Sequence, residues 1–173
     1  MPRNIEIKAR LRDAAAVRRR AEALADGPSE VIAQTDTFFH APHGRLKLRE
    51  FENSAGELIH YQRPDAVGPK ESRYAIVRIE QAEPLRRALA DALGVRCVVR
   101  KTRTLLMVGP TRIHLDQVEG LGAFLELEVV LRPEQDAAEG ERIAGDLMRG
   151  LGIRAEDLVA GAYADLLMPG STD

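Results

Sequence analysis

Charged and apolar side chains alternate along several short segments, and this pattern restricts the fold more than any other feature of the sequence. Residues 4–11 place Ile5, Ile7 and Leu11 on one side and polar or charged residues on the other. A period of two is typical of a β-strand whose two faces meet different surroundings. The same alternation returns at residues 45–49 and 112–118. The sequence therefore predicts a sheet with one apolar face and one charged face.

Turn and helix signals divide the 173 residues into about eight strands separated by helices. We expect strands at residues 4–11, 31–39, 45–49, 57–63, 73–79, 97–108, 112–118 and 124–131. We expect helices at residues 13–25 with Asp13 as N-cap, at 83–93, at 134–151, and a short one ending near residue 167.

Eight antiparallel strands can close into a barrel whose lumen holds one small ligand. The predicted fold class is therefore α+β, a closed eight-stranded antiparallel β-barrel with flanking helices. We expect a single domain over residues 1–168 and a frayed tail at residues 169–173.

Composition limits the class of ligand. With 25 basic and 27 acidic residues the net charge is −2, so the chain has no overall field that attracts nucleic acid or an anionic membrane. Seven aromatic residues are too few for the stacking platforms of single-strand binders. Cys97 is the single cysteine, and the sequence contains no signal segment or long apolar run. We expect a cytoplasmic protein, monomer or homodimer, that binds a small molecule.

Like charges gather on the predicted charged faces. Basic residues dominate the early strands, whereas Asp116, Glu126 and Glu128 gather on the last two. One interpretation is a solvated sheet face held by weak cross-strand ion pairs. The recurrence of the pattern on several strands favours another, because rows of like charge repel unless a counter-ion joins them. A polyphosphate would join the basic rows, and a divalent cation would join the acidic one.

Other signals are weaker. The sequence contains no Walker-type GxxxxGK[ST] motif and no GxGxxG, so a phosphate would be held by side chains rather than by a glycine-rich loop. Of the four histidines, His114 alone shares the charged face. Tyr163 is interpreted as a packing residue.

The ordered set of charged motifs resembles the CYTH superfamily, the triphosphate tunnel metalloenzymes named for class IV adenylyl cyclase and thiamine triphosphatase. The resemblance covers nearly the whole chain. The family opens with an ExExK strand, which reads Asn4-Ile5-Glu6-Ile7-Lys8 here. Basic pairs follow at residues 47 and 49 and at 101 and 103, and acidic residues close the set. Residues 112–128 and 163–167 look especially like the class IV adenylyl cyclase branch.

This resemblance implies a triphosphate substrate and Mg²⁺ or Mn²⁺ as cofactor. It implies that Glu6, Asp116, Glu126 and Glu128 bind the metal and that Glu6 and Lys8 are catalytic. It implies triphosphate contacts from Lys8, Lys47, Arg49, Arg63, Arg73, Arg103 and Arg112, to which the charged faces add Arg10, Arg45 and Lys101. Asn4 stands where the family has its first glutamate, so the number of metal ions stays open.

Three functions remain open. Hydrolysis of an inorganic, nucleoside or thiamine triphosphate leads, because it requires only a positioned water. Cyclisation of ATP to cAMP and pyrophosphate would use the same lining, since both reactions depend on positioning and electrostatic stabilisation. A module that binds polyphosphate or a nucleotide without turnover is the third, and clustered carboxylates would bring such an anion binder no benefit.

Overall fold

The computed structural model describes residues 2–168, so the expected tail at residues 169–173 lies outside the described residues. The strands are β1 (Arg3–Arg10), β2 (Glu30–Phe39), β3 (Arg45–Phe51), β4 (Gly56–Gln62), β5 (Lys70–Ile79), β6 (Val95–Val108), β7 (Thr111–Val118) and β8 (Gly122–Val130). The helices are α1 (Ala14–Leu24), α2 (Ala82–Leu93), α3 (Ala137–Leu151) and α4 (Tyr163–Leu167), with a 3₁₀ turn at Ala155–Asp157.

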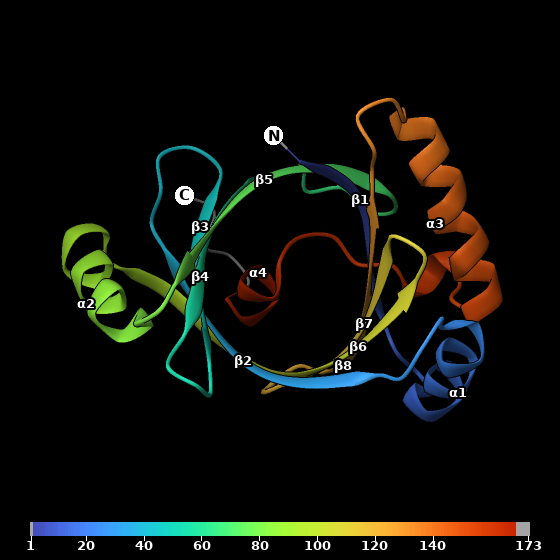
Figure 1. Ribbon diagram of the computed structural model, residues 1–173, viewed down its shortest axis with the longest axis horizontal. Helices are drawn as coiled ribbons and strands as arrows, with labels where there is room; N and C mark the ends of the chain where they lie inside the picture. The colour runs from blue at the N-terminus through green and yellow to red at the C-terminus, as the bar shows by residue number, and fades with distance from the viewer. Residues whose placement is uncertain (1, 169–173) are drawn as a thin grey trace.

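The eight strands close into one barrel in the order β1-β5-β4-β3-β2-β6-β7-β8. Every pair of neighbours is antiparallel. Figure 1 looks into this ring, with α1, α2 and α3 outside it and α4 seen within its outline. Closure pairs the strand edges that an open sheet would expose. The predicted α+β barrel is therefore confirmed.

Helices cover two opposite sides of the barrel (Figure 1). α1 and α3 pack beside β1, β6, β7 and β8, whereas α2 packs on β2 and β3. Asp13 caps α1 as expected, because its side chain accepts a hydrogen bond from the backbone N–H of Ala16 at 2.9 Å. Within the described part of the chain, no helix combines the length and apolar character needed to cross a bilayer.

The apolar face of β1 forms the main core beneath α3. Ile5 and Ile7 are buried there against Leu127 and Ala144, and burying one such side chain stabilises the fold by roughly 1.5–3 kcal/mol. Gly140 lets α3 approach closely, because a Cβ at this position would lie 2.5 Å from Ile5 Cγ1. The opposite, charged face of β1 therefore faces the lumen.

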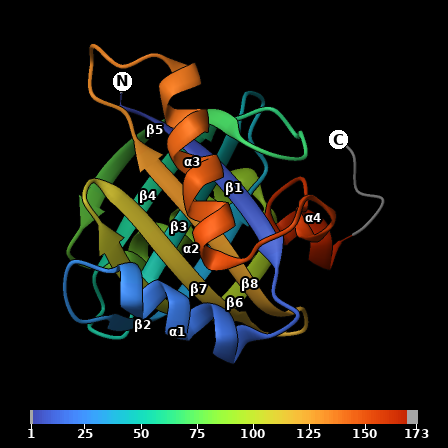
Figure 2. The same ribbon diagram turned by 90° about the vertical axis from the view of Figure 1, so that its right-hand side faces the viewer.

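α4 covers one end of the barrel. Figure 2 shows the N-terminal end of β1 and α4 at opposite ends of the molecule. Tyr163, the first residue of α4, packs edge-on against Phe124 with ring centroids 5.1 Å apart. The lumen is thus closed by side chains at one end and accessible from the other.

Candidate functional site

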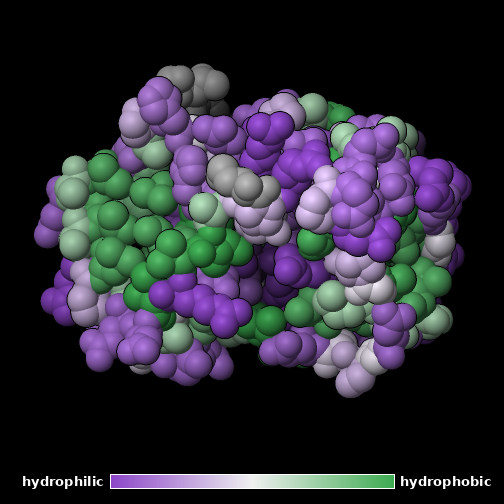
Figure 3. Space-filling model, turned by 45° about the horizontal axis from the view of Figure 1, so that its top comes forward, coloured by the Kyte–Doolittle hydropathy of each residue, from purple (hydrophilic) through white to green (hydrophobic). Residues whose placement is uncertain are grey.

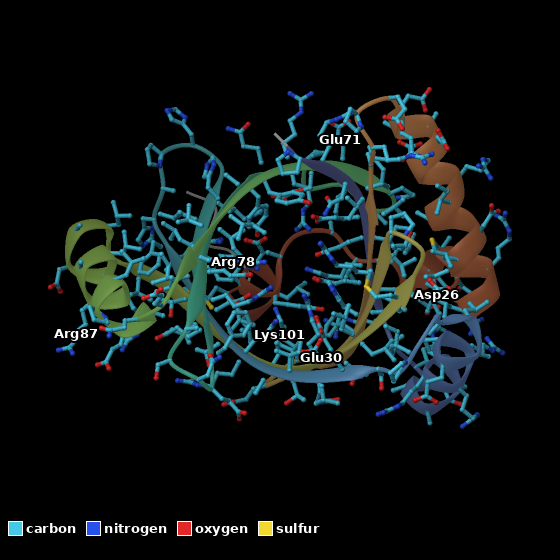
Figure 4. The ribbon with its side chains drawn as sticks, viewed as in Figure 1. Asp26, Glu30, Glu71, Arg78, Arg87 and Lys101 are labelled. Atoms are coloured by element: carbon cyan, nitrogen blue, oxygen red, sulfur yellow. The ribbon has the colours of Figure 1, made fainter. Side chains whose placement is uncertain are left out.

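A cavity of about 320 Å³ occupies the lumen. Its hollow has hydrophilic residues at the floor (Figure 3). Among the described residues its lining includes seven basic and five acidic side chains. The basic residues are Lys8, Lys47, Arg49, Arg63, Lys101, Arg103 and Arg112, and the acidic residues are Glu6, Asp36, Glu57, Glu126 and Glu128. In Figure 4, Lys101 lies inside the ring while Arg87 lies outside it on α2.

Asp36 on β2 lies at the centre of the basic side. Its carboxylate accepts hydrogen bonds from Lys47 Nζ at 2.9 Å, from Arg49 Nε and Nη2 at 2.8 Å each, and from Lys101 Nζ at 3.2 Å. Only 1% of Asp36 is exposed. Burial acts to raise the pKa of Asp36, but the three cations, Arg49 foremost, hold it well below the ordinary value. We call these four residues the Asp36 cluster.

This cluster changes the interpretation of the basic rows. We expected them to repel one another unless a bound anion joined them. The order β3-β2-β6 places the Lys47 and Arg49 strand on one side of Asp36 and the Lys101 strand on the other. The protein's own carboxylate therefore joins the cations before any ligand enters.

Lys101 is the cation of this cluster whose charge is most easily lost. The pKa of Lys101 is lowered to about 7. Burial is the main cause, and the charges of Arg103 and Arg49 also lower the pKa, whereas the charge of Asp36 acts to raise it. Its ammonium also lies 5.3 Å from the centroid of the Tyr163 ring. A phosphate beside Lys101 would favour the protonated form.

Asp116 and Glu6, two of the four acids expected to bind metal, lie outside the group of acids that surrounds His114. Arg103 donates to Asp116 from Nε at 2.7 Å and from Nη2 at 2.6 Å, and the Tyr163 hydroxyl donates to Asp116 at 2.9 Å. Glu6 forms an ion pair with Arg63. Burial would raise the pKa of Asp116, but the charge of Arg103 outweighs it and the pKa is lowered. The set of four acids is thus not gathered around one point.

The other two acids lie beside a histidine. His114 Nδ1 is 3.9 Å from a carboxylate oxygen of Glu126 and 3.8 Å from one of Glu128. One ligand atom from each of the three residues lies within 4.8 Å of the other two. We call these residues the His114 cluster. Carboxylate oxygens are ligands that Mg²⁺ and Mn²⁺ accept, so the donor set fits a divalent cation.

Basic residues border this cluster and connect it to the rest of the tunnel. Lys8 Nζ lies 3.2 Å from Glu126, and Arg103 Nη2 lies 2.8 Å from it. Arg112 Nη1 lies 3.2 Å from Glu128. Lys8 also lies 4.0 Å from the centroid of the Tyr163 ring. The cationic groups that could bind phosphate therefore lie in direct contact with Glu126 and Glu128.

Asn4 and Arg63 also face the tunnel, as expected. The Asn4 side-chain oxygen is buried without a hydrogen-bond partner in the described part of the chain. Arg63 donates through Nη2 to the carbonyl oxygen of Gly161 at 3.0 Å, as Lys8 does through Nζ at the same distance. The segment before α4 is therefore tied to two of the residues expected to contact triphosphate.

Arg73 does not reach the tunnel. β5 begins at Lys70, and its inward side chains are Ser72, Tyr74 and Ile76. Arg73 is exposed and pairs with Glu71 at 3.1 Å. The loop before β5 hid this register in the sequence, so the expected contact from Arg73 does not fit the structure.

Arg10 and Arg45 also lie outside the tunnel lining. Arg10 is exposed and its guanidinium lies 4.8 Å from the centroid of the Phe124 ring. Arg45 forms ion pairs of 2.8 Å with Asp65 and with Asp165 of α4. Arg45 thereby holds α4 at the closed end of the barrel, a role that the sequence pattern did not indicate.

Sequence reasoning missed Asp36 and interpreted Tyr163 only as a packing residue. Asp36 lies on a strand whose two faces both carry polar residues, so alternation gave no sign of its orientation. Tyr163 packs as expected, but it also lines the tunnel and binds Asp116. Its place depends on the C-terminal segment crossing the barrel end, which no local pattern encodes.

Comparisons with known proteins agree with this geometry. The sequence profile of the family described as CYTH domain matches residues 2–163. The adenylate cyclase CyaB of Aeromonas hydrophila is 27% identical over 141 residues, which cover 77% of this chain and 71% of that protein.

Solved structures share the barrel. The PH1012 protein of Pyrococcus horikoshii is 25% identical with a TM-score of 0.84, and the match covers 94% of this chain and 98% of that one. A Hippeastrum protein, described as a candidate adenylyl cyclase that reveals a dominant triphosphatase activity, is 16% identical with a TM-score of 0.64. That match covers 95% of each chain and concerns the fold.

Proposed function

The chain belongs to the CYTH domain family, and we propose that it is a metal-dependent enzyme that hydrolyses a triphosphate held in the tunnel. One observation carries the proposal. Buried basic side chains and the carboxylates of the His114 cluster line the same cavity, with Lys8 and Arg103 contacting Glu126 directly. A purely structural barrel would have no need to bury so many charges, because burying an ion costs several kcal/mol unless it is well paired.

The basic lining would hold the phosphates. We assign this role to Lys8, Lys47, Arg49, Arg63, Lys101, Arg103 and Arg112, all of which line the cavity. An arginine presents a rigid fork of donors that matches phosphate oxygens, and a lysine adds a compact charge. An entering triphosphate would compete with Asp36 for Lys47, Arg49 and Lys101. These side chains are already turned toward the lumen, so little reorientation is needed for binding.

Glu126 and Glu128 would hold Mg²⁺ or Mn²⁺. The ion, when bound, would neutralise charge on the phosphate oxygens. Around it, Arg103 and Arg112 orient the two carboxylates through their ion pairs. These contacts keep the acidic pair beside the phosphate-binding residues.

Hydrolysis would add one water to the terminal phosphorus while the bridging P–O bond breaks and the diphosphate part leaves. Glu6 and Lys8 are inward neighbours on β1, and we propose that they take part in this step. Glu6 would accept a proton from the attacking water, and Lys8 would stabilise charge on the transferred group. The stacking of Tyr163 against Lys8 excludes water from one side of that ammonium.

A cyclase is the second candidate, supported by the similarity to the adenylate cyclase of Aeromonas hydrophila. The triphosphatase activity described for the Hippeastrum protein supports hydrolysis on this fold. The phosphate-binding lining would serve either reaction, because it contacts the phosphates rather than the group attached to them. A binding module without turnover is the third candidate.

Product analysis separates the three. The protein is incubated with tripolyphosphate, ATP or thiamine triphosphate and Mg²⁺ or Mn²⁺, and products are followed by phosphorus NMR. Hydrolysis releases orthophosphate, and cyclisation of ATP yields cAMP and pyrophosphate. Binding by calorimetry without any product would favour the binding module and reject the proposal. Glu126→Gln serves as the control for a contaminating phosphatase, since its activity should be lost.

A further inference from the structure

His114 is buried, with only 4% of the residue exposed, and its Nδ1 atom has no hydrogen-bond partner in the described part of the chain. A buried imidazole nitrogen without a partner is costly, because such groups are nearly always satisfied in folded proteins. The nitrogen faces Glu126 and Glu128 but stands 3.8–3.9 Å from their oxygens, too far for a hydrogen bond. Glu126 pairs with Lys8 and Arg103, and Glu128 pairs with Arg112, so the group of this cluster that is left without a partner among the described residues is the nitrogen of His114.

The separations suit a shared ion. Ligand atoms about 2.1 Å from one metal lie at most about 4.2 Å apart. The two distances from Nδ1 satisfy this limit, and small rotations of the glutamates would bring all three atoms, now within 4.8 Å, to one ion. Arg112 contacts Oε2 of Glu128, whereas Oε1 is the oxygen nearer His114. That oxygen can turn to a metal while the arginine pair persists.

The Nδ1 atom of His114, which has no partner among the described residues, is a nitrogen donor of the kind that metals commonly bind. Mg²⁺ takes oxygen ligands and sheds water reluctantly, whereas first-row transition ions accept imidazole together with carboxylate.

We propose that His114 Nδ1 is a metal ligand together with Glu126 and Glu128, and that this nitrogen makes the tunnel prefer Mn²⁺ to Mg²⁺. The inference rests on the proposed metal-dependent function and deepens it by naming the ligand and the ion. Asp116, which the resemblance placed in the metal set, binds Arg103 at two points and Tyr163, and it lies outside the group of ligand atoms within 4.8 Å of one another. The site therefore offers one nitrogen and two carboxylates.

Pulsed electron paramagnetic resonance of Mn²⁺ bound to the wild-type protein tests this directly. We expect the modulation of a coordinated ¹⁴N nucleus, a signal that requires no variant. His114→Asn puts an amide near the Nδ1 position and should lose the nitrogen signal. Its ratio of Mn²⁺ to Mg²⁺ affinity, from calorimetry, should fall by roughly tenfold or more.

His60→Asn is the matched control. His60 lies on β4 at the rim near His43, whose carbonyl oxygen is 3.0 Å from its Nε2, and it does not line the tunnel. This variant should keep both the nitrogen signal and the metal preference. Tight Mn²⁺ binding without a nitrogen signal, with the same affinity in His114→Asn, would overturn the inference and leave the proposed function intact. If the wild-type protein binds neither ion, in the presence or absence of tripolyphosphate, both fall.

Discussion

The tunnel contains two charged clusters that differ in how completely the protein satisfies them. In the Asp36 cluster, a buried carboxylate receives hydrogen bonds of 2.8–3.2 Å from three cations. In the His114 cluster, the nearest oxygens stand 3.8–3.9 Å from a nitrogen that has no partner among the described residues. The carboxylate of the first cluster thus has all its partners from the protein, whereas in the second cluster the two glutamates pair with Lys8, Arg103 and Arg112 but the histidine nitrogen does not.

The comparison shows that the basic side of the tunnel is ordered before any ligand binds, whereas the His114 cluster keeps a nitrogen without a partner in the described part of the chain. Asp36 holds Lys47, Arg49 and Lys101 in place, so the phosphate-binding side is ordered before substrate arrives. Preorganised charges stabilise a bound group without a reorganisation cost at that moment. On the acidic side, Glu126 and Glu128 pair with Lys8, Arg103 and Arg112, and the nitrogen of His114 is left without a partner among the described residues.

The largest expected effect comes from Asp36→Asn. It leaves three buried cations without their shared negative charge, and breaking a buried pair costs about 3–5 kcal/mol. We expect the free energy of unfolding, measured by urea denaturation, to fall by this amount. Asp91→Asn on the exposed face of α2 is the control and should change it little. Equal stability of both variants would mean that the Asp36 cluster is not the structural centre of the basic side.

The next effect compares two acids on neighbouring strands. Glu126→Gln should weaken Mn²⁺ binding and lower metal-dependent activity by roughly a hundredfold, about 2.7 kcal/mol. It should also lower apo stability, because Lys8 and Arg103 lose a carboxylate partner. Asp116→Asn should also destabilise the fold, since Arg103 loses a partner that it contacts at two points, but it should leave Mn²⁺ affinity nearly unchanged. Calorimetric Mn²⁺ titration and thermal melting of both variants give the readout. Loss of Mn²⁺ affinity in Asp116→Asn but not in Glu126→Gln would return Asp116 to the set of metal ligands.

A smaller effect is expected from Tyr163→Phe. The change removes one hydrogen bond to the Asp116 carboxylate but keeps the ring that packs on Phe124. We expect a loss of about 1.5 kcal/mol in unfolding free energy. Hydrogen exchange at the backbone amides of α4 should speed up relative to that of α3. No change in either measurement would mean that the hydroxyl contributes nothing to holding α4 at the barrel end.

The smallest effect concerns protons. Lys101, with its pKa lowered to about 7 by burial, is mostly neutral at pH 8, and a bound triphosphate would favour its charged form. Binding should therefore take up protons, and affinity should fall as the pH rises above about 7. Lys101→Met should reduce the uptake, measured by calorimetry in two buffers of different ionisation enthalpy. Identical uptake in the variant would exclude Lys101 from the binding step.

The sequence predicted the barrel and most inward-facing charges because strand alternation is a local property. The inward positions of Glu6, Lys8, Lys47 and Arg49 follow from alternation alone. The residues with which these side chains pair cannot be predicted from alternation. Asp36 joins Lys101 and Arg49 only because β2 lies between β6 and β3, a pairing set by the whole barrel.

The sequence was least informative where the local alternation of residues does not determine how a strand is placed in the barrel. Arg73 follows a loop that conceals where β5 begins, so its outward orientation was hidden. The metal role expected of Asp116 stays a prediction, but its contacts with Arg103 and Tyr163 could not be read from the alternation. Both cases depend on contacts between residues far apart in the sequence.

The metal dependence of turnover tests the account most directly. Phosphorus NMR of tripolyphosphate with the wild-type protein should show orthophosphate and pyrophosphate accumulating with Mn²⁺, and no conversion once excess EDTA is added. Renewed turnover on adding Mn²⁺ back would show that the chelator had not harmed the protein. Undiminished hydrolysis in excess EDTA would contradict the account.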